Sequence, residues 1–287
     1  MGKIGIIGGS GLYHIEEFEI KEKKRISTPF GEPSDEYVIG ELEGKEVVFL
    51  PRHGKGHHVL PTELNYRANV YGFKTLGVSR IISVSAVGSL KEEMAPLDVV
   101  LVDQFVDRTN QGRSTTFFGE GAVAHIQFAE PICTELRELI YRSNRGLDVK
   151  IHDGGTYINM EGPAFSTKAE SYLYKSWGID VIGMTNMPEA RLAREAGICY
   201  STIALVTDYD SWHLGPEAEH VSVEMIIANL IKNVETAKKM IINTIKNMPE
   251  EFSCECAQAL KDALITGKEN IPKKTLKKLG PILDGIG

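Results

Sequence analysis

Short apolar runs rich in β-branched residues recur along most of the chain, and helical patterns separate several of them. The runs cover residues 4–7, 47–50, 80–85, 99–105, 156–160, 181–184 and 201–206. Apolar residues at helical spacing mark residues 62–76, 131–145, 167–177, 188–195 and 221–247. Strands that alternate with helices predict an α/β fold with a largely parallel sheet wrapped by helices. A length of 287 residues suits one large domain of this class.

The overall charge narrows the class of ligand that this chain can hold. The formal net charge is -7 and the pI is near 5.7, which argues against a general binder of nucleic acid or anionic membranes. Any anionic ligand must therefore be held by a local site. The sequence has no signal-peptide pattern and no apolar run of transmembrane length, so we expect a cytoplasmic protein without a membrane partner.

Two acids follow the apolar run at residues 203–206, in the segment Thr207-Asp208-Tyr209-Asp210. The carboxyl ends of the strands in an open α/β sheet form the edge where small ligands bind. If the strand continues to Asp210, its period of two points both carboxyl groups to one face. Paired acids in a dry site have pKa values pushed apart, so one can hold a proton while the other is ionised. Such a pair suits a donor beside an acceptor, as in N6 and N7 of adenine, and a solvated acidic turn is the alternative.

Three further segments at predicted strand ends are suited to an anion. Residues 5–12 are glycine-rich and supply backbone N–H groups with the hydroxyl of Ser10, although a plain tight turn is equally consistent with them. They fit neither the dinucleotide-binding nor the P-loop motif. In residues 51–58, Arg52 can grip a phosphate bidentately and His53 can donate to a further oxygen. Zinc is the weaker interpretation of these histidines, because no HExxH motif accompanies them. Residues 83–89 place small hydroxyl residues at a third strand end.

The four cysteines are expected to be free thiols in a reducing compartment. Cys133 and Cys199 fall in apolar patterns and are interpreted as buried thiols. Cys254 and Cys256 are placed in an exposed connection, where a strained disulfide between them is plausible in a thermophilic source. Their CxC spacing is unlike that of a zinc knuckle and has no second ligand pair beside it, so no metal site is predicted.

The order of the motifs resembles that of the 5'-methylthioadenosine phosphorylases, within the trimeric purine nucleoside phosphorylase group. The resemblance covers residues 3–245 and is carried by the segments 5–12, 28–34, 52–54, 86–90, 103–109, 161–166, 184–185, 195–200 and 207–210. It implies a single-domain fold in which helices wrap a central mixed, twisted β-sheet. Residues 1–250 would form the phosphorylase domain and residues 251–287 a C-terminal helical extension packed on it.

The resemblance also implies an activity and a set of site residues. Phosphate would cleave 5'-methylthioadenosine to adenine and 5-methylthioribose 1-phosphate, in purine and methionine salvage, without a metal or an organic cofactor. Asp208 would be the catalytic acid, with Asp210 at the edge of the base, Met184 against the ribose, and Phe165 and Ile182 near the base. The residues implied to bind phosphate are Ser10, Arg52, His53, Ser85, Ala86 and Thr185. Specificity would depend on Ser166, Val223 and Ile226, of which the last two line a pocket for the 5'-methylthio group.

The implied assembly is a homotrimer or a dimer of trimers, in which His125 reaches into the site of a neighbouring subunit. Three alternatives remain at this point. A phosphorylase for 6-oxopurine nucleosides or methylthioinosine is disfavoured because an ionised Asp would repel the 6-oxo group. A binding module for adenine nucleosides is disfavoured because both the phosphate set and the acids are present. A dinucleotide-dependent oxidoreductase is disfavoured by the glycine spacing.

Overall fold

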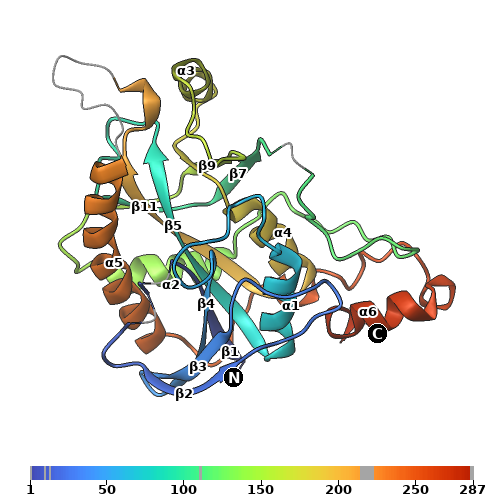
Figure 1. Ribbon diagram of the computed structural model, residues 1–287. Helices are drawn as coiled ribbons and strands as arrows, with labels where there is room; N and C mark the ends of the chain where they lie inside the picture. Colours follow the sequence, from blue (N-terminus) through green and yellow to red (C-terminus); the bar gives the residue numbers. More distant parts are fainter. Residues whose placement is uncertain (1, 10, 13, 110–111, 214–222, 285–287) are drawn as a thin grey trace.

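The structure is a computed structural model that describes residues 2–9, 11–12, 14–109, 112–213 and 223–284, except the side chains of residues 223–226. Its centre is a mixed sheet of 11 strands within these ranges (Figure 1). The main path runs β2-β3-β4-β1-β5-β10-β9-β7, while β11 pairs with β5 and β6, and β8 pairs with β6. The strands are β1 (Lys3–Gly8), β2 (Glu19–Lys24), β3 (Tyr37–Leu42), β4 (Lys45–Pro51), β5 (Val78–Ser89), β6 (Val99–Leu101), β7 (Gln104–Asp107), β8 (Ile151–Asp153), β9 (Thr156–Asn159), β10 (Val181–Gly183) and β11 (Cys199–Asp208).

The pairing of neighbouring strands makes the sheet mixed, as the resemblance implied. Strand β1 lies parallel to both β4 and β5, and β11 lies parallel to β5. Strands β2 and β3, β3 and β4, β10 and β5, and β11 and β6 are antiparallel pairs. The prediction of one strand at residues 99–105 is wrong, because β6 and β7 divide this segment and pair with different neighbours.

Helices cover both faces of the sheet. The helices are α1 (Tyr66–Thr75), α2 (Thr134–Asn144), α3 (Lys168–Ser176), α4 (Asn186–Glu195), α5 (Val223–Lys246) and α6 (Lys273–Leu283), with short 3-10 turns η1 (Asp210–Trp212), η2 (Glu255–Gln258) and η3 (Lys268–Asn270). Helices α2 and α5 lie together on one face, and α1, α4 and α6 lie on the other (Figure 1). None of the described helices is long and apolar enough to cross a membrane.

The alternation of side chains along β1 supplies both layers of the core. Ile4 and Ile6 join the apolar cluster beneath α2 and α5, whereas Ile7 joins the cluster beneath α1, α4 and α6. This is the period-two geometry of a strand that is buried on both faces. Burial on both faces explains why the run at residues 4–7 is almost continuously apolar.

Several helix boundaries differ from the sequence prediction. Helix α1 begins after Asn65, whose side chain accepts a hydrogen bond from the backbone N–H of Ala68, and not at Thr62. An Asn side chain satisfies one of the free N–H groups of the first turn, which makes it a good N-cap. Helix α4 begins at Asn186 and so includes Pro188 in its first turn, where proline is tolerated.

The C-terminal segment packs on the rest of the chain. Leu260, Ile271, Leu279 and Ile282 belong to the same core cluster as residues of α1 and α4. Helix α6 buries one face through Thr275, Leu279 and Ile282. The division of the chain at residue 250 stays a prediction.

Candidate active site

The carboxyl ends of β5 and β11 bring the acidic pair close to the centre of the sheet. Strand β11 pairs Asp208 with Gly88 of β5, and β10 pairs Ile182 with the same glycine. A Cβ atom at Gly88 would lie 3.1 Å from both Asp208 Oδ1 and Ile182 Cγ2, and 3.2 Å from Asp210 Cβ. Three of the predicted base-site residues therefore gather around Gly88, where an added Cβ atom would be in tight contact with all three.

The two acids meet through a turn and not through a continued strand. Strand β11 ends at Asp208, and Asp210 begins η1 with a φ of 46°. The backbone N–H of Asp210 donates to Asp208 Oδ1 over 2.8 Å. The expectation that strand alternation aligns the two carboxyl groups is therefore wrong, although the turn still places them side by side.

Each carboxyl group has its own hydrogen-bond partners. Thr207 Oγ1 donates to Asp208 Oδ2 over 2.7 Å, and Ser166 Oγ lies 2.7 Å from both carboxylate oxygens of Asp210. Burial raises the pKa of Asp208, while the hydrogen bonds from Thr207 and from the Asp210 N–H oppose that rise. Asp208 can therefore hold a proton at a higher pH than an exposed aspartate can.

The ends of β1 and β4 bring the glycine-rich loop next to Arg52. Gly8 pairs with Pro51, and the backbone N–H of Arg52 donates to the Gly8 carbonyl over 2.9 Å. The predicted phosphate ligand Ser10 follows in this loop and lies outside the described residues. The parallel pairing of β1 with β5 brings a third strand end to the same edge of the sheet.

Arg52 is held in a buried ion pair with Glu189 of α4. Its Nε donates to Glu189 Oε1 over 2.5 Å and its Nη2 donates to Oε2 over 3.0 Å. The exposed fractions of the two side chains are 3% and 1%. Nη1 and Nη2 also donate to the Val84 carbonyl and to Ser83 Oγ. Glu189 therefore occupies the Nε–Nη2 edge of Arg52 in this arrangement, and a bidentate grip of Arg52 on phosphate stays a prediction.

His53 is fixed in one tautomer by its surroundings. Its Nδ1 lies 2.8 Å from the Val59 carbonyl, which can only accept, so Nδ1 must carry a proton. Burial, followed by the charge of Arg52, lowers the pKa of His53 to about 4. At neutral pH, Nε2 therefore presents a lone pair. In this state the free nitrogen of His53 is an acceptor, and its contact with phosphate stays a prediction.

The remaining described phosphate candidates line the neighbouring strand and helix ends. Ser85 and Val87 of β5 are buried, whereas Ala86 between them is exposed. The strand is therefore accessible at Ala86. Thr185 is buried and is the N-cap residue of α4. The free backbone N–H groups of a helix's first turn attract anions. Glu189 of α4 pairs with Arg52, which follows directly after β4, so the N-terminal half of α4 lies at the end of that strand.

Met184 is positioned by Arg113, which the sequence analysis did not single out. Arg113 Nη1 donates to the Met184 carbonyl over 2.5 Å, and its Nε donates to Glu161 Oε1 over 2.7 Å. Gly162 allows Met184 to approach, since a Cβ there would lie 2.5 Å from the Met184 sulfur. Phe165 remains half exposed, whereas Ile182 is buried.

One other candidate, His125, lies apart from this group. His125 is exposed, and its backbone N–H donates to the Ala263 carbonyl, so it lies beside the C-terminal segment. The side chains of Val223 and Ile226 fall outside the described residues. Neighbouring positions of α5 do reach the end of β11, since Asn229 Nδ2 donates to the Thr207 carbonyl over 2.8 Å.

Comparison with known proteins identifies the family. Residues 3–246 match the family model of the phosphorylase superfamily. The S-methyl-5'-thioadenosine phosphorylase of Geobacter sulfurreducens is 56% identical over 280 residues, which cover 98% of this chain and 97% of that protein. The corresponding protein of Synechocystis is 54% identical over 98% of this chain and 86% of its own length.

Solved structures agree with this relationship. A methylthioadenosine phosphorylase from an antarctic soil metagenomic library superposes with a TM-score of 0.93 at 48% identity, covering 98% of this chain and 99% of that one. The methylthioadenosine phosphorylase of Schistosoma mansoni, in complex with adenine, superposes with a TM-score of 0.85 at 37% identity, covering 91% and 96%. The sequence match and the shared fold together show that this chain belongs to the S-methyl-5'-thioadenosine phosphorylase family of the phosphorylase superfamily.

Proposed function

We infer that this chain cleaves 5'-methylthioadenosine with inorganic phosphate, releasing adenine and 5-methylthioribose 1-phosphate. This is a pentosyl transfer that serves purine and methionine salvage. The single observation that supports the inference most strongly is the pair of buried acids at the end of β11, beside the open position at Ala86. The proposal assigns the two carboxyl groups to the base and the end of β5 to phosphate, and both lie at one edge of the sheet.

In the proposed phosphate site, the anion would be held more by backbone N–H and hydroxyl dipoles than by charged side chains. Backbone N–H groups near Ala86 and at the start of α4, with the hydroxyls of Ser10, Ser85 and Thr185, would surround the anion. Arg52 would contribute its remaining Nη1 hydrogen and hold the strand ends together. Nε2 of His53 would accept the P–O–H proton of HPO₄²⁻ as a hydrogen bond.

The chemical step follows from this placement. A phosphate oxygen forms a bond to C1' of the ribose while the bond from C1' to N9 of the purine breaks. The electron pair of the broken bond moves into the purine, and the carboxylic acid of Asp208 gives a proton to N7. The remaining phosphate proton leaves the product ester through solvent, and this restores the acid form of Asp208. Positioning and general acid help account for the acceleration.

The other site residues would bind the nucleoside. Asp210, held by Ser166, would accept from the N6 amino group, with Ile182 and Phe165 beside the base and Met184 against the ribose. We propose that Val223 and Ile226 line the pocket for the 5'-methylthio group. The bonds from Asn229 and Asn233 to the end of β11 support this placement of α5.

Assembly and location complete the proposal. The exposed position of His125 is suited to a contact with a neighbouring subunit, in a homotrimer or a dimer of trimers. The reaction itself uses phosphate as a co-substrate, and we propose that it needs no organic cofactor or catalytic metal. We also propose a cytoplasmic location, a reducing compartment in which cysteines remain without disulfides.

The test is a nucleoside panel with and without phosphate. Purified protein is incubated with 5'-methylthioadenosine, adenosine, methylthioinosine and inosine, and the free base and sugar phosphate are quantified by chromatography. We expect adenine and methylthioribose 1-phosphate in equal amounts, and only when phosphate is present. Adenine release without phosphate indicates a hydrolase, and a preference for inosine or methylthioinosine indicates the 6-oxopurine alternative. Either result contradicts the proposal.

A further inference from the structure

All four cysteines of the chain meet at one place, on the side of the molecule where the C-terminal segment joins β11. The sulfur atoms all lie within 4.8 Å of one another, and we call this group the thiol cluster: Cys133, Cys199, Cys254 and Cys256. The sulfurs of Cys199 and Cys254 are 3.3 Å apart, and the thiol of Cys256 interacts with the other three. Cysteines that serve only as small apolar residues have no reason to converge in this way.

The fold holds these residues in separate, well-anchored elements. Cys133 is the N-cap residue of α2, Cys199 is the first residue of β11, and Cys254 and Cys256 lie at the start of η2. The backbone N–H of Cys133 donates to the Tyr200 carbonyl, and that of Cys254 donates to Glu135 Oε2, each over 2.9 Å. The CxC pair thus finds the second ligand pair that was missing from its neighbourhood in the sequence.

The spacing of the sulfurs matches the needs of a tetrahedral ion. Zinc binds cysteine sulfur at about 2.3 Å, so the sulfurs of a tetrahedral site stand about 3.8 Å apart. The thiol cluster has sulfur separations that include 3.3 Å and reach no more than 4.8 Å. The known separations thus differ from the tetrahedral value by no more than about 1 Å, a change that rotation of the side chains can supply.

We propose that the thiol cluster is a structural site for one Zn²⁺ ion with four cysteine ligands. On binding, four S–H groups release four protons to solvent and form four Zn–S bonds, which leaves a site of charge -2. A closed set of four thiolates has no open position for substrate, so the site stabilises the fold and takes no part in the reaction.

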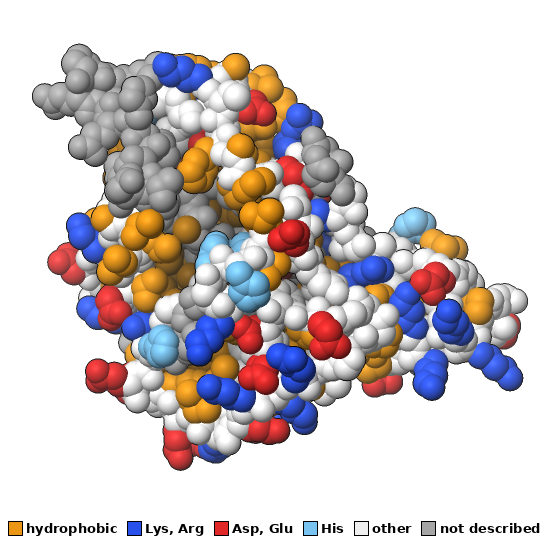
Figure 2. Space-filling model, viewed as in Figure 1, with side chains coloured by type: hydrophobic (Ala, Val, Ile, Leu, Met, Phe, Trp, Pro, Cys, Tyr) orange, Lys and Arg blue, Asp and Glu red, His pale blue; other side chains and the backbone are white. Residues whose placement is uncertain are grey.

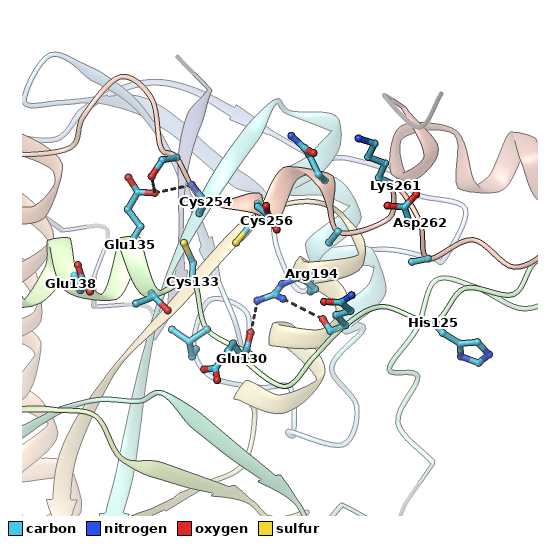
Figure 3. Close-up of a pocket in the computed structure, with 18 of the residues that line it drawn as sticks. His125, Glu130, Cys133, Glu135, Glu138, Arg194, Cys254, Cys256, Lys261 and Asp262 are labelled. Carbon is cyan, nitrogen blue, oxygen red and sulfur yellow. Dashed lines mark hydrogen bonds between the residues drawn. The ribbon is translucent and has the colours of Figure 1, made fainter.

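The surroundings provide compensating charge and an entry path. The guanidinium group of Arg194 lines the same hollow as Cys133, Cys254 and Cys256, and it places a positive charge near the cluster. The N-terminus of α2 adds positive potential at Cys133. A hollow of about 870 Å³ is lined by Cys133, Cys254, Cys256 and Arg194, and gives an ion access to the cluster (Figure 3).

The site would clamp the C-terminal segment onto the start of β11. Cys254 and Cys256 open the segment that leads to α6, and Cys199 begins the strand whose opposite end carries Asp208. The four ligands come from segments that are far apart in the sequence and meet only in the folded chain. The free energy of binding the ion therefore adds to the stability of the fold. The inference concerns stability and is independent of the proposed function.

Metal content and cobalt binding test the proposal directly. The intact protein, purified without chelator or affinity metal, is analysed for zinc by mass spectrometry, and we expect one equivalent per chain. Protein that has been reduced and stripped under anaerobic conditions is then titrated with Co²⁺. We expect saturation at one equivalent, with thiolate charge-transfer bands and the visible bands of a tetrahedral cobalt site, and displacement by one equivalent of Zn²⁺.

A cysteine variant and a matched control complete the experiment. The Cys133→Ser, Cys256→Ser double variant should lose the cobalt spectrum, whereas Ser253→Ala in the same segment should keep it. Stripping zinc from the unaltered protein should lower its melting temperature by several degrees and leave the catalytic rate at 25 °C unchanged. Absence of a cobalt–thiolate spectrum in the reduced, unaltered protein overturns the proposal, whether or not the double variant folds. Disulfides in the isolated protein with no metal uptake after reduction also overturn it.

Discussion

Replacing Asp208 with asparagine removes the proposed proton donor while keeping the shape of the side chain. The Asn carbonyl oxygen can accept the hydrogen bond that the Asp210 N–H now gives to Asp208 Oδ1. The Asn amide nitrogen then faces Thr207 Oγ1, and that hydroxyl can instead donate to the Val87 carbonyl, which lies 3.2 Å away. Every buried partner remains satisfied, so we expect a folded protein with little loss of stability.

The expected loss of activity follows from the role of a general acid. Such a group contributes a factor of about 10²–10⁴, or roughly 2.7–5.5 kcal/mol of transition-state stabilisation. We expect kcat on 5'-methylthioadenosine to fall within this range and the phosphate KM to change little. Because burial raises the pKa of Asp208, the parent rate should decline as pH rises and the acid form is lost. The residual rate of Asp208→Asn should lack that decline.

The assay is steady-state adenine release between pH 5 and 9, with the melting temperature measured in parallel. Asp148→Asn makes the same chemical change on an exposed side chain and should behave like the parent. A kcat for Asp208→Asn within threefold of the parent, with an unchanged pH profile, refutes the assignment of Asp208. A gain of activity on inosine would instead support the argument that an ionised Asp repels the 6-oxo group of that base.

Other predictions test the ion pair, a buried acid and the assembly. Arg52→Met and Glu189→Met should each cost about 3–5 kcal/mol in chemical denaturation, because each leaves a buried charge unpaired, and the double variant with both changes should lose less than their sum. Additive losses would contradict the pairing. Burial raises the pKa of Glu195 from 4.5 to about 7, so the folded protein favours the protonated carboxyl group. The contribution of this group to the free energy of unfolding is complete below pH 4.5 and is lost as pH rises through 7. The change amounts to about 3 kcal/mol, and Glu195→Gln should therefore gain thermal stability over the parent at pH 8.5 but not at pH 4.5. Asp208→Asn subunits mixed with His125→Ala subunits should regain part of the activity, and verified mixed trimers without recovery would exclude a shared site.

The apolar strands were predictable because burial on both faces leaves a strong signal. The composition of residues 4–7 and 201–206 alone predicts strands. The acids Asp208 and Asp210 after the second run indicate the edge of the sheet where a ligand binds. Strand β2 gave no such signal, since it is the exposed, charged segment Glu19–Lys24 at the edge of the sheet. Charged edge strands protect a sheet from aggregation but look like loops in a sequence.

The partners of the site residues could not be predicted, because they depend on tertiary contacts. Glu189 sits in a helix like many other acids, and only the packing of α4 against the end of β4 reveals it as the counterion of Arg52. Arg113 was missed for the same reason. The thiol cluster is the clearest example of such tertiary contacts. Cys133 and Cys199 lie far from the CxC pair in the sequence, but the fold brings all four sulfur atoms together.

The fixed tautomer of His53 has a consequence for which anions the site accepts. Nε2 presents a lone pair and the charge of Arg52 is already balanced by Glu189, so an incoming anion is not selected by net charge. Hydrogen phosphate carries a proton that can meet this lone pair, whereas sulfate at neutral pH carries none and would place an oxygen lone pair against it. If phosphate contacts His53 as proposed, the Val59 carbonyl, by holding the proton on Nδ1, would make the site favour hydrogen phosphate over sulfate, an anion of nearly equal size and charge. Since the discrimination arises from a short-range contact, added salt should screen it little.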